Sequence, residues 1–322
     1  ASMLIAHICA AAGLLSLTVL PEAFSDPFVG LLLSVIIYAV GGGLLEVLVS
    51  PVMESCPTEN KEKAMSLLHS FYCWGHVAVV LISTVFFRIF GISNWKILAI
   101  GWAAVPLANL FLFAKAPIAS LMKEGEQGLT LRELLSQKIF WVFLLMMVCA
   151  GASEQSVSQW ASAFAEKALG VGKTVGDLAG PMAFAVLMGI SRAFYGKYGD
   201  KIDLDRFMGG SAILCILSYL CISLIPIPAA GLIGCAICGL SVGIMWPGAF
   251  SRASATIRRG GTAMFAFLAL AGDLGCSGGP TLVGLVSSRF GNNLRAGILA
   301  AILFPVLLLL GILTSKRRKN KN

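Results

Sequence analysis

Stretches of about 20 mostly apolar residues recur along nearly the whole of this 322-residue chain. A helix of that length crosses the roughly 30 Å hydrocarbon core of a bilayer, where the backbone must satisfy its own hydrogen bonds. The stretches lie near residues 2–20, 28–50, 64–88, 95–114, 139–163, 177–197, 206–225, 229–251, 262–287 and 295–314. The sequence therefore predicts an all-α polytopic membrane protein with ten helices.

Composition excludes the soluble alternatives. Hydrophobic residues make up 57% of the chain and charged residues 12%, against about 25% charged residues in soluble domains. A soluble core of this size cannot absorb so much apolar surface. The net charge of +8 is therefore no sign of a nucleic-acid partner, and secreted, nuclear and disordered proteins are excluded too.

The basic residues are distributed unevenly over the predicted loops. Eighteen of the 24 lysines and arginines fall in one set of loops and the C-terminal tail, and six fall in the other set. Cytoplasmic loops carry the excess of Lys and Arg. We therefore expect a multi-pass protein of the cell (plasma or inner) membrane with both ends of this chain in the cytoplasm.

Internal similarity divides the chain into two halves. Matching residues recur at offsets of 196 to 200: Gly75 with Gly275, Phe90-Gly91 with Phe290-Gly291, and Pro51 with Pro247. In this register the spans 139–163 and 177–197 have no counterparts, so two helices are expected before Ala1 in a twelve-helix parent protein. The predicted domains are a four-helix N-terminal bundle (1–115), a cytoplasmic linker (116–138, including Lys123 to Gln127) and a six-helix C-terminal bundle (139–322).

A glycine-containing loop follows the sixth span. Gly196, Asp200, Lys201 and Arg206 resemble the G-x-x-x-D loop signature of the major facilitator superfamily, although Asp203 stands where that signature has a second glycine. The resemblance implies two pseudo-symmetric helix bundles with a long central loop, as in that superfamily. An ordinary charged cytoplasmic turn is the alternative interpretation.

Three further segments resemble the fucose–galactose–glucose proton symporter family. Residues 41–51 read as three glycines, Leu-Leu-Glu, Val-Leu-Val and Ser-Pro, where that family has glycines, Leu-Glu and Ala-Asn-Pro. Residues 67–75 are similar to its fifth helix, with His69 in place of Gln, and Trp246-Pro247 is similar to an aromatic-Pro pair in its tenth helix. The resemblance implies sugar uptake driven by protons.

Carboxylates inside the spans are candidate functional residues, because ionisable groups in a bilayer are costly. Glu46 shares a helix face with Gly42 and Ser50, and we expect it to couple protons or bind solute. The resemblance implies that Glu154 lines a cavity, and the neighbouring Gln155 is expected to lie along it. The alternative for Glu46 is a structural role, in which neighbouring backbone or serine groups form hydrogen bonds with it. The alternative for Glu154 is a charge at the membrane interface. Arg192 and Lys197 are expected to reach the cytoplasmic interface.

A second set of polar residues follows helical spacing. His69, Tyr72 and His76 share one face and are expected to line the cavity, with a helix–helix hydrogen bond as the alternative. Asp273 is equally compatible with gating and with binding. Trp246 can stack on a sugar or sit in an interfacial belt. No third ligand accompanies the histidines, so neither a metal site nor a cofactor is expected.

We therefore expect a secondary active transporter that moves a small polar solute, with sugar favoured, by alternating access and coupled to protons. A drug or organic-acid exporter of the same superfamily is the alternative. A membrane enzyme is disfavoured because H-E-x-x-H and G-x-S-x-G are absent from the sequence; a channel or solute sensor is disfavoured by the two-fold repeat. The expected partners are the solute, protons and the bilayer, with no nucleic acid and a monomeric state.

Overall fold

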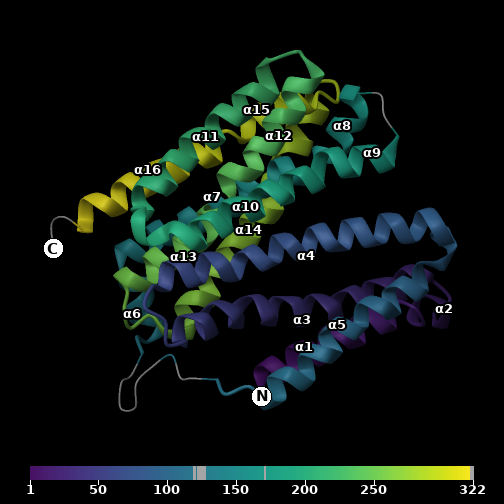
Figure 1. Cartoon of the computed structure of the whole chain (residues 1–322), viewed down its shortest axis with the longest axis horizontal. Helices are drawn as coiled ribbons and strands as arrows, with labels where there is room; N and C mark the ends of the chain where they lie inside the picture. Colours follow the sequence, from purple (N-terminus) through teal and green to yellow (C-terminus); the bar gives the residue numbers. More distant parts are fainter. Residues whose placement is uncertain (119–120, 122–127, 170–171, 320–322) are drawn as a thin grey trace. The chain divides into compact units, whose positions relative to one another are not determined.

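The computed structural model describes residues 1–118, 121, 128–169 and 172–319, and every regular element in those ranges is helical (Figure 1). The predicted all-α class is therefore confirmed. Nine of the described helical segments are long and apolar enough to cross a membrane, from Pro27–Ser55 to Leu294–Ser315, and Ser2–Ser16 is a shorter apolar helix. These ten segments correspond to the ten predicted spans. The linker residues Lys123 to Gln127 lie outside the described ranges.

The chain divides into two compact units. Unit 1 contains Ala1–Cys56 and residues 81–118. Its elements are α1 (Ser2–Ser16), α2 (Leu20–Ala23), α3 (Pro27–Ser55), the later part of α4 (Lys61–Phe90), η1 (Ile92–Asn94) and α5 (Trp95–Lys115). Helix α1 packs against both α3 and α5. A Cβ at Gly41 would lie 2.4 Å from the backbone nitrogen of Ala10, so the close approach of α3 and α1 requires glycine there.

Unit 2 contains Pro57–Val80 and the described residues from Gly128 onward. Its first elements are the early part of α4, α6 (Leu131–Ser136), α7 (Lys138–Ser158), α8 (Ala161–Leu169), α9 (Lys173–Asp177), the π-helical η2 (Leu178–Met182), α10 (Ala183–Tyr198) and η3 (Gly199–Lys201). The remaining ones are α11 (Leu204–Leu224), α12 (Pro228–Val242), α13 (Met245–Thr256), α14 (Gly261–Arg289), α15 (Leu294–Ala301) and α16 (Leu303–Lys319).

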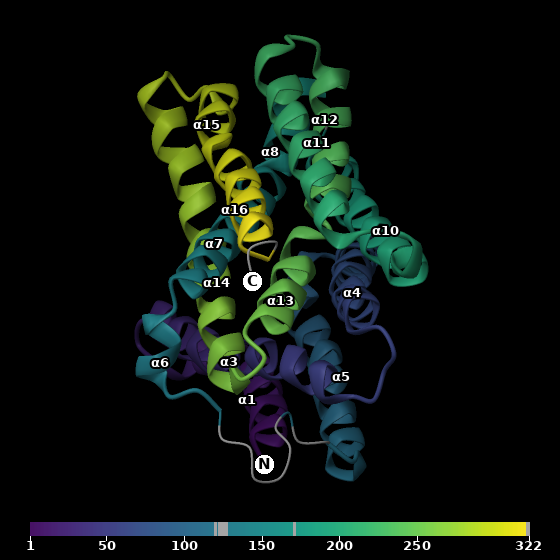
Figure 2. The same ribbon diagram turned by 90° about the vertical axis from the view of Figure 1, so that its left-hand side faces the viewer.

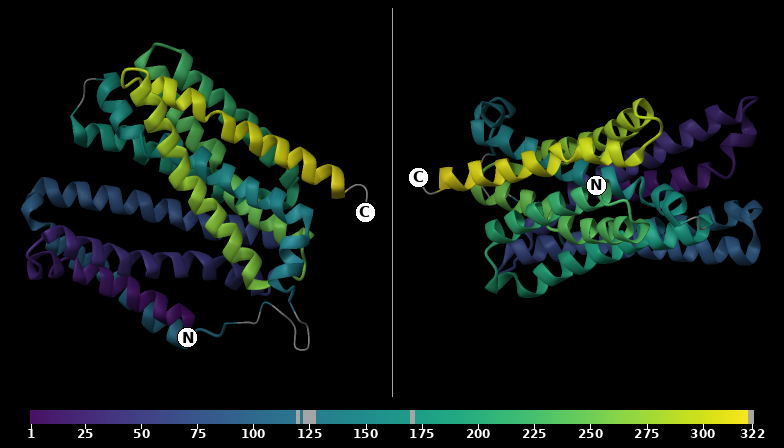
Figure 3. Two further views of the ribbon diagram at one scale, coloured as in Figure 1. Left: turned by 180° about the vertical axis from the view of Figure 1, so that it is seen from behind. Right: turned by 90° about the horizontal axis from the view of Figure 1, so that it is seen from above.

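Packing within unit 2 centres on α7. It crosses α14 closely, and α11 and α12 lie side by side (Figure 2). Helix α16 contacts α7 and α11 (Figure 3). A Cβ at Gly275 of α14 would lie only 2.0 Å from the carbonyl oxygen of Val148 on α7. Small residues at this crossing therefore let the two backbones approach.

The unit boundary and the predicted domain boundary use different criteria. The sequence assigns all of α4 to the N-terminal bundle through the internal repeat, whereas contacts group Pro57–Val80 with unit 2. The helices that α4 contacts in this structure do not show whether α4 belongs to the first or the second half of the internal repeat. The domain boundaries at 115 and 139 therefore stay a prediction.

Several of the predicted continuous spans are interrupted, and two of these breaks follow α7 and α12. Helix α7 ends at Ser158 and α8 begins at Ala161, within the predicted span 139–163. Helix α12 ends at Val242 and α13 begins at Met245, within the span 229–251. Pro247 explains the second break, because it has no N–H to donate to the carbonyl of Gly243 four residues earlier.

Candidate solute and proton site

A buried ion pair lies inside unit 2. Arg192 on α10 donates from Nη2 to Oε2 of Glu154 on α7 over 3.1 Å, and these side chains are only 3% and 8% exposed. A single charge buried in a low dielectric is very costly unless an opposite charge and hydrogen bonds accompany it. Each member of this pair therefore makes burial of the other possible.

Two backbone carbonyls complete the surroundings of the Arg192 guanidinium. Its Nε donates to the carbonyl oxygen of Gly243 over 2.8 Å, and its Nη1 donates to that of His69 over 2.9 Å. The Gly243 carbonyl is the one that Pro247 leaves without its helical donor. Arg192 thus supplies the hydrogen bond that this carbonyl lacks at the break between α12 and α13, and it connects the break to α4 and α7.

Aromatic side chains surround this centre. The guanidinium carbon of Arg192 lies 5.8 Å from the ring centroid of Tyr72, within the range of a cation–π interaction. The ring of His69 stacks on Phe250 with centroids 5.8 Å apart, and Trp246 meets Phe250 edge-on at 6.1 Å. Tyr72 is 55% exposed, so one aromatic ring of the site is accessible.

The structure brings together four of the residues singled out from the sequence. Glu154, His69 and Tyr72 each contact Arg192 through a side chain or a carbonyl, and Trp246 joins them through Phe250. His76 lies one turn from Tyr72, with ring centroids 6.5 Å apart.

The other candidate residues lie elsewhere. Gln155 follows Glu154 on α7 and is half-buried, and Asp273 of α14 has an exposed side chain. Glu46 lies on α3 in unit 1, where its side chain is exposed. The ion pair and Glu46 are therefore features of different units.

Sequence reasoning placed Arg192 at the cytoplasmic interface, and that prediction is wrong. The whole residue is 2% exposed, because Glu154 and the two carbonyls replace water around the guanidinium. Two features of the sequence are compatible with a buried position of Arg192. Glu154 lies in a span without a basic partner nearby, and Pro247 leaves an orphan carbonyl within a span.

A second polar cluster contains the loop signature. Asp200 of η3 pairs with Lys63 of α4 and accepts from Nδ2 of Asn60 over 2.8 Å. The hydroxyl of Tyr195 donates to Oε2 of Glu62 over 2.9 Å. The predicted signature residue Asp200 therefore connects the loop to α4.

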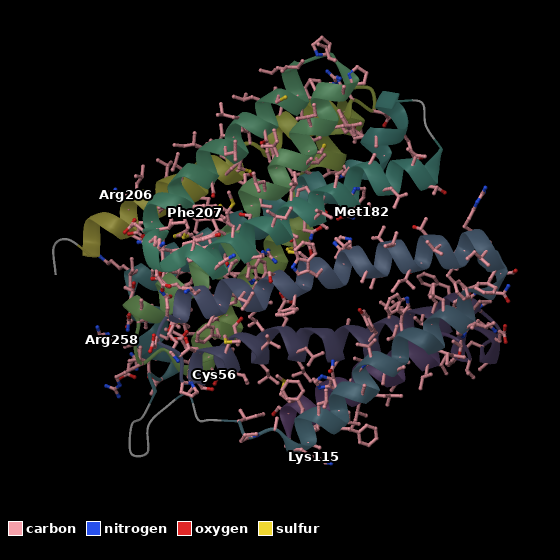
Figure 4. All side chains as sticks on the ribbon, viewed as in Figure 1. Cys56, Lys115, Met182, Arg206, Phe207 and Arg258 are labelled. Carbon is pink, nitrogen blue, oxygen red and sulfur yellow. The ribbon has the colours of Figure 1, made fainter. Side chains whose placement is uncertain are left out.

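The remaining signature residues shape the same turn. A Cβ at Gly196 would lie 3.2 Å from Cβ of Leu67 on α4, and Lys201 and Arg206 are exposed. Asp203, which stands at the expected second glycine, accepts from the backbone N–H of Arg206 over 2.8 Å and caps α11. Figure 4 shows Arg206 and Arg258 toward the same end of unit 2, with Met182 farther along the bundle.

Comparisons with known proteins agree with this architecture. The family model described as the Major Facilitator Superfamily matches residues 2–280. The membrane protein MosC of Rhizobium meliloti is 21% identical over 263 residues, which cover 81% of this chain and 62% of that protein. The chain thus spans less than two thirds of the length of this relative.

Two solved structures are similar in fold. The E. coli fucose:proton symporter FucP has a TM-score of 0.80 at 15% identity, covering 98% of this chain and 83% of that one. The proton:xylose symporter XylE has a TM-score of 0.76 at 14% identity, covering 96% and 78%. At such low identity these likenesses show the fold, while activity must be argued from the site.

Proposed function

Because the chain belongs to the major facilitator superfamily, we propose that the protein is a secondary active transporter moving a small polar solute by alternating access. Its apolar helical spans and its fold support this proposal. In such transporters the solute site lies near the bilayer midplane, next to discontinuous helices. The break between α12 and α13, beside a buried charged pair, is the single observation on which the proposal most depends.

Protons are the proposed coupling ion. A carboxylate and a guanidinium inside membrane spans mark ion or proton pathways, and Glu154 with Arg192 is such a pair. FucP and XylE are both proton symporters by name, which favours the same coupling here. The proposed proton and solute site comprises Glu154, His69, Tyr72, His76, Gln155 and Trp246, with Glu46 and Asp273 as further carboxylates.

A sugar is the favoured solute. FucP and XylE carry sugars by name, and the exposed ring of Tyr72 offers an aromatic face for a sugar ring. Export of an organic acid is the second candidate, because a buried arginine such as Arg192 recognises carboxylates well.

The proposed setting is the cell membrane, with a monomer whose chain ends both face the cytoplasm. The distribution of basic residues supports this orientation. In it, Gly196, Asp200, Lys201 and Arg206 form a cytoplasmic turn that holds α4 through the Asp200–Lys63 pair. Neither enzymatic chemistry nor a nucleic-acid partner belongs to the proposal.

Uptake into proteoliposomes tests the proposal. The purified protein is reconstituted and given radiolabelled sugars and organic acids, with an inward proton gradient and with a protonophore added. We expect one solute class to accumulate and the protonophore to abolish the accumulation. Failure of every solute to exchange or accumulate would refute transport, and accumulation that survives the protonophore would refute proton coupling.

A further inference from the structure

We infer that Arg192 binds the carboxylate of an acidic solute, and that Glu154 takes up one proton when it yields its place on the guanidinium. One monocarboxylate and one proton would then move together. The inference rests on the proposed transport function, and it selects the acid, the second candidate solute class, over a neutral sugar and names the residues of coupling. It begins from the geometry of the buried pair.

The guanidinium of Arg192 has more N–H donors than the carbonyls and the carboxylate around it occupy. A guanidinium carries five N–H groups, and three of them donate to Gly243, His69 and Glu154. The Cys73 thiol is a further, weak hydrogen-bond partner of the guanidinium, and Glu154 accepts only one N–H of Nη2. Terminal nitrogens of arginine pair with the two oxygens of a carboxylate in a planar, bidentate geometry. An incoming carboxylate can therefore replace that of Glu154 on the same group.

Two of the acceptors of Arg192 do not change their charge when a proton binds. The carbonyls of Gly243 and His69 are neutral backbone groups. They hold the guanidinium in position whether or not Glu154 remains paired with it. The pair can thus exchange its carboxylate without the arginine leaving the site.

Charge balance then requires a proton. A guanidinium with two carboxylates would place a net negative charge in a low-dielectric interior, which is strongly disfavoured. The balanced exchange is RCOO⁻ + H⁺ + Glu154-COO⁻···Arg192⁺ → RCOO⁻···Arg192⁺ + Glu154-COOH. The incoming anion forms the new ion pair, the old one breaks, and the proton stays on Glu154.

Tyr72 marks the side of approach. Its ring lies against the guanidinium, and 55% of its surface is exposed. Glu154 and Arg192 are themselves buried among α4, α7, α10 and the break after α12. A solute reaching the pair past Tyr72 would place its apolar or hydroxylated body against an aromatic ring.

The titratable groups on the helices packed around the pair are consistent with this assignment. Helix α4 contributes His69, Tyr72 and Cys73, the last of which interacts electrostatically with both charges. The helices packed against α7 contribute Asp273 and Cys276 (α14), Cys235 and Cys238 (α12), Arg252 (α13), Arg295 (α15) and Glu166 (α8). Arg252 is paired with Asp205. Glu154 is therefore the carboxylate in direct contact with Arg192 among the described residues.

Proton uptake on binding tests the inference. Purified protein in weakly buffered detergent solution is mixed with D-glucuronate, D-gluconate or lactate, or with neutral D-glucose, while pH and binding heat are recorded. We expect about one proton taken up per carboxylate bound, as the charge balance requires. D-Glucose should bind without proton uptake or not bind. Glu154→Gln should bind the acid without taking up a proton, and Arg192→Gln should lose acid binding. Glu22→Gln, which alters an exposed ion pair of unit 1, should behave like the wild type.

An infrared difference spectrum makes the test independent of the variants' folding. Adding D-glucuronate to wild-type protein at constant pH should produce the C=O stretch of a protonated carboxylic acid. Acid binding without that band and without proton uptake would overturn the inference, as would failure of all three acids to bind. Proton-driven uptake of neutral sugar alone would overturn it while leaving the proposed transport function standing. Proton-linked acid binding without any solute uptake would contradict the transport function instead.

Discussion

Arg192 holds three segments of unit 2 together through one guanidinium. Its acceptors are a carboxylate on α7, a mid-helix carbonyl on α4 and the carbonyl that the α12–α13 break exposes. Each hydrogen bond from a charged donor contributes about 1.5–3 kcal/mol to stability. Losing the planar group should therefore weaken the bundle even when the positive charge remains.

Arg192→Lys tests this role of the planar group. A lysine ammonium is a point charge that cannot serve three diverging acceptors with the same geometry, so we expect a loss of about 2 kcal/mol, from the loss of one charged hydrogen bond. Arg192→Ala should cost more, about 3–5 kcal/mol, because Glu154 stays buried without its partner. Thermal unfolding in detergent measures both changes, with exposed Arg206→Lys as the control. Equal midpoints for Arg192→Lys and wild type would contradict the assignment.

Glu46 remains the second carboxylate that could carry the coupled proton. Glu46→Gln keeps the size and much of the hydrogen bonding of the side chain but cannot ionise. Because the inferred coupling proton is carried by Glu154, we expect this variant to insert, to exchange solute and to accumulate it under a pH gradient as the wild type does. Counterflow and gradient-driven uptake separate these two activities. Exchange without gradient-driven accumulation would instead make Glu46 the coupling residue and would contradict the assignment to Glu154.

At the scale of elements, α7 and α14 depend on glycine where their backbones cross. Gly275→Ala would place a Cβ 2.0 Å from the Val148 carbonyl oxygen, and a backbone atom cannot rotate away. We expect this variant to lose folded protein in detergent. Gly278→Ala on the same helix is the matched control, because nothing lies within 4 Å of its added Cβ. Size-exclusion profiles compare the two, and equal monodisperse yields would contradict the predicted clash.

The short helix α6 carries a pH-dependent cap. Thr130 donates from its backbone N–H and its hydroxyl to Glu133, at 2.8 Å and 2.9 Å, and these bonds, with the charge of Arg259, hold the pKa of Glu133 below its ordinary 4.5. A depressed pKa in the folded state adds stability that is present above pH 4.5 and is lost as pH falls through the lower folded value. The cap should therefore weaken only in acid.

Hydrogen-exchange protection factors across α6 measure this effect. We expect protection to be constant from pH 7 down to about 5 and to fall below pH 4.5, the ordinary pKa of a Glu carboxyl. Glu133→Gln retains an amide oxygen that can accept from Thr130 and cannot titrate in this range. Its protection should therefore show no such fall. The same acid-induced loss in both proteins would assign it to another group.

The membrane orientation belongs to the whole molecule. Cys56 follows α3, is half-buried and precedes the basic start of α4. The excess of basic residues on its side of the membrane predicts a cytoplasmic position. A membrane-impermeant maleimide should therefore label Cys56 in inside-out vesicles but not in intact cells, as read by peptide mass spectrometry. Labelling in intact cells would reverse the proposed orientation.

The sequence by itself determined the helical spans and the family, because both depend on local properties. A bilayer selects for length and hydropathy, which can be counted along the chain, and the repeat at offsets near 200 needs no coordinates. Glu154, His69, Tyr72 and Trp246 could also be selected individually as unusual polar or aromatic residues within spans.

Only the tertiary structure decided which of these residues meet. Arg192 lies 38 residues from Glu154 along the chain, and a charge near a predicted helix end is equally compatible with an interface and with a buried pair. Its position depends on where α4, α7, α10 and the break at Gly243 converge in unit 2. In a buried, low-dielectric position the guanidinium needs the carboxylate of Glu154 and the unpaired carbonyl of Gly243 as hydrogen-bond acceptors. At a membrane interface, water would accept these hydrogen bonds instead.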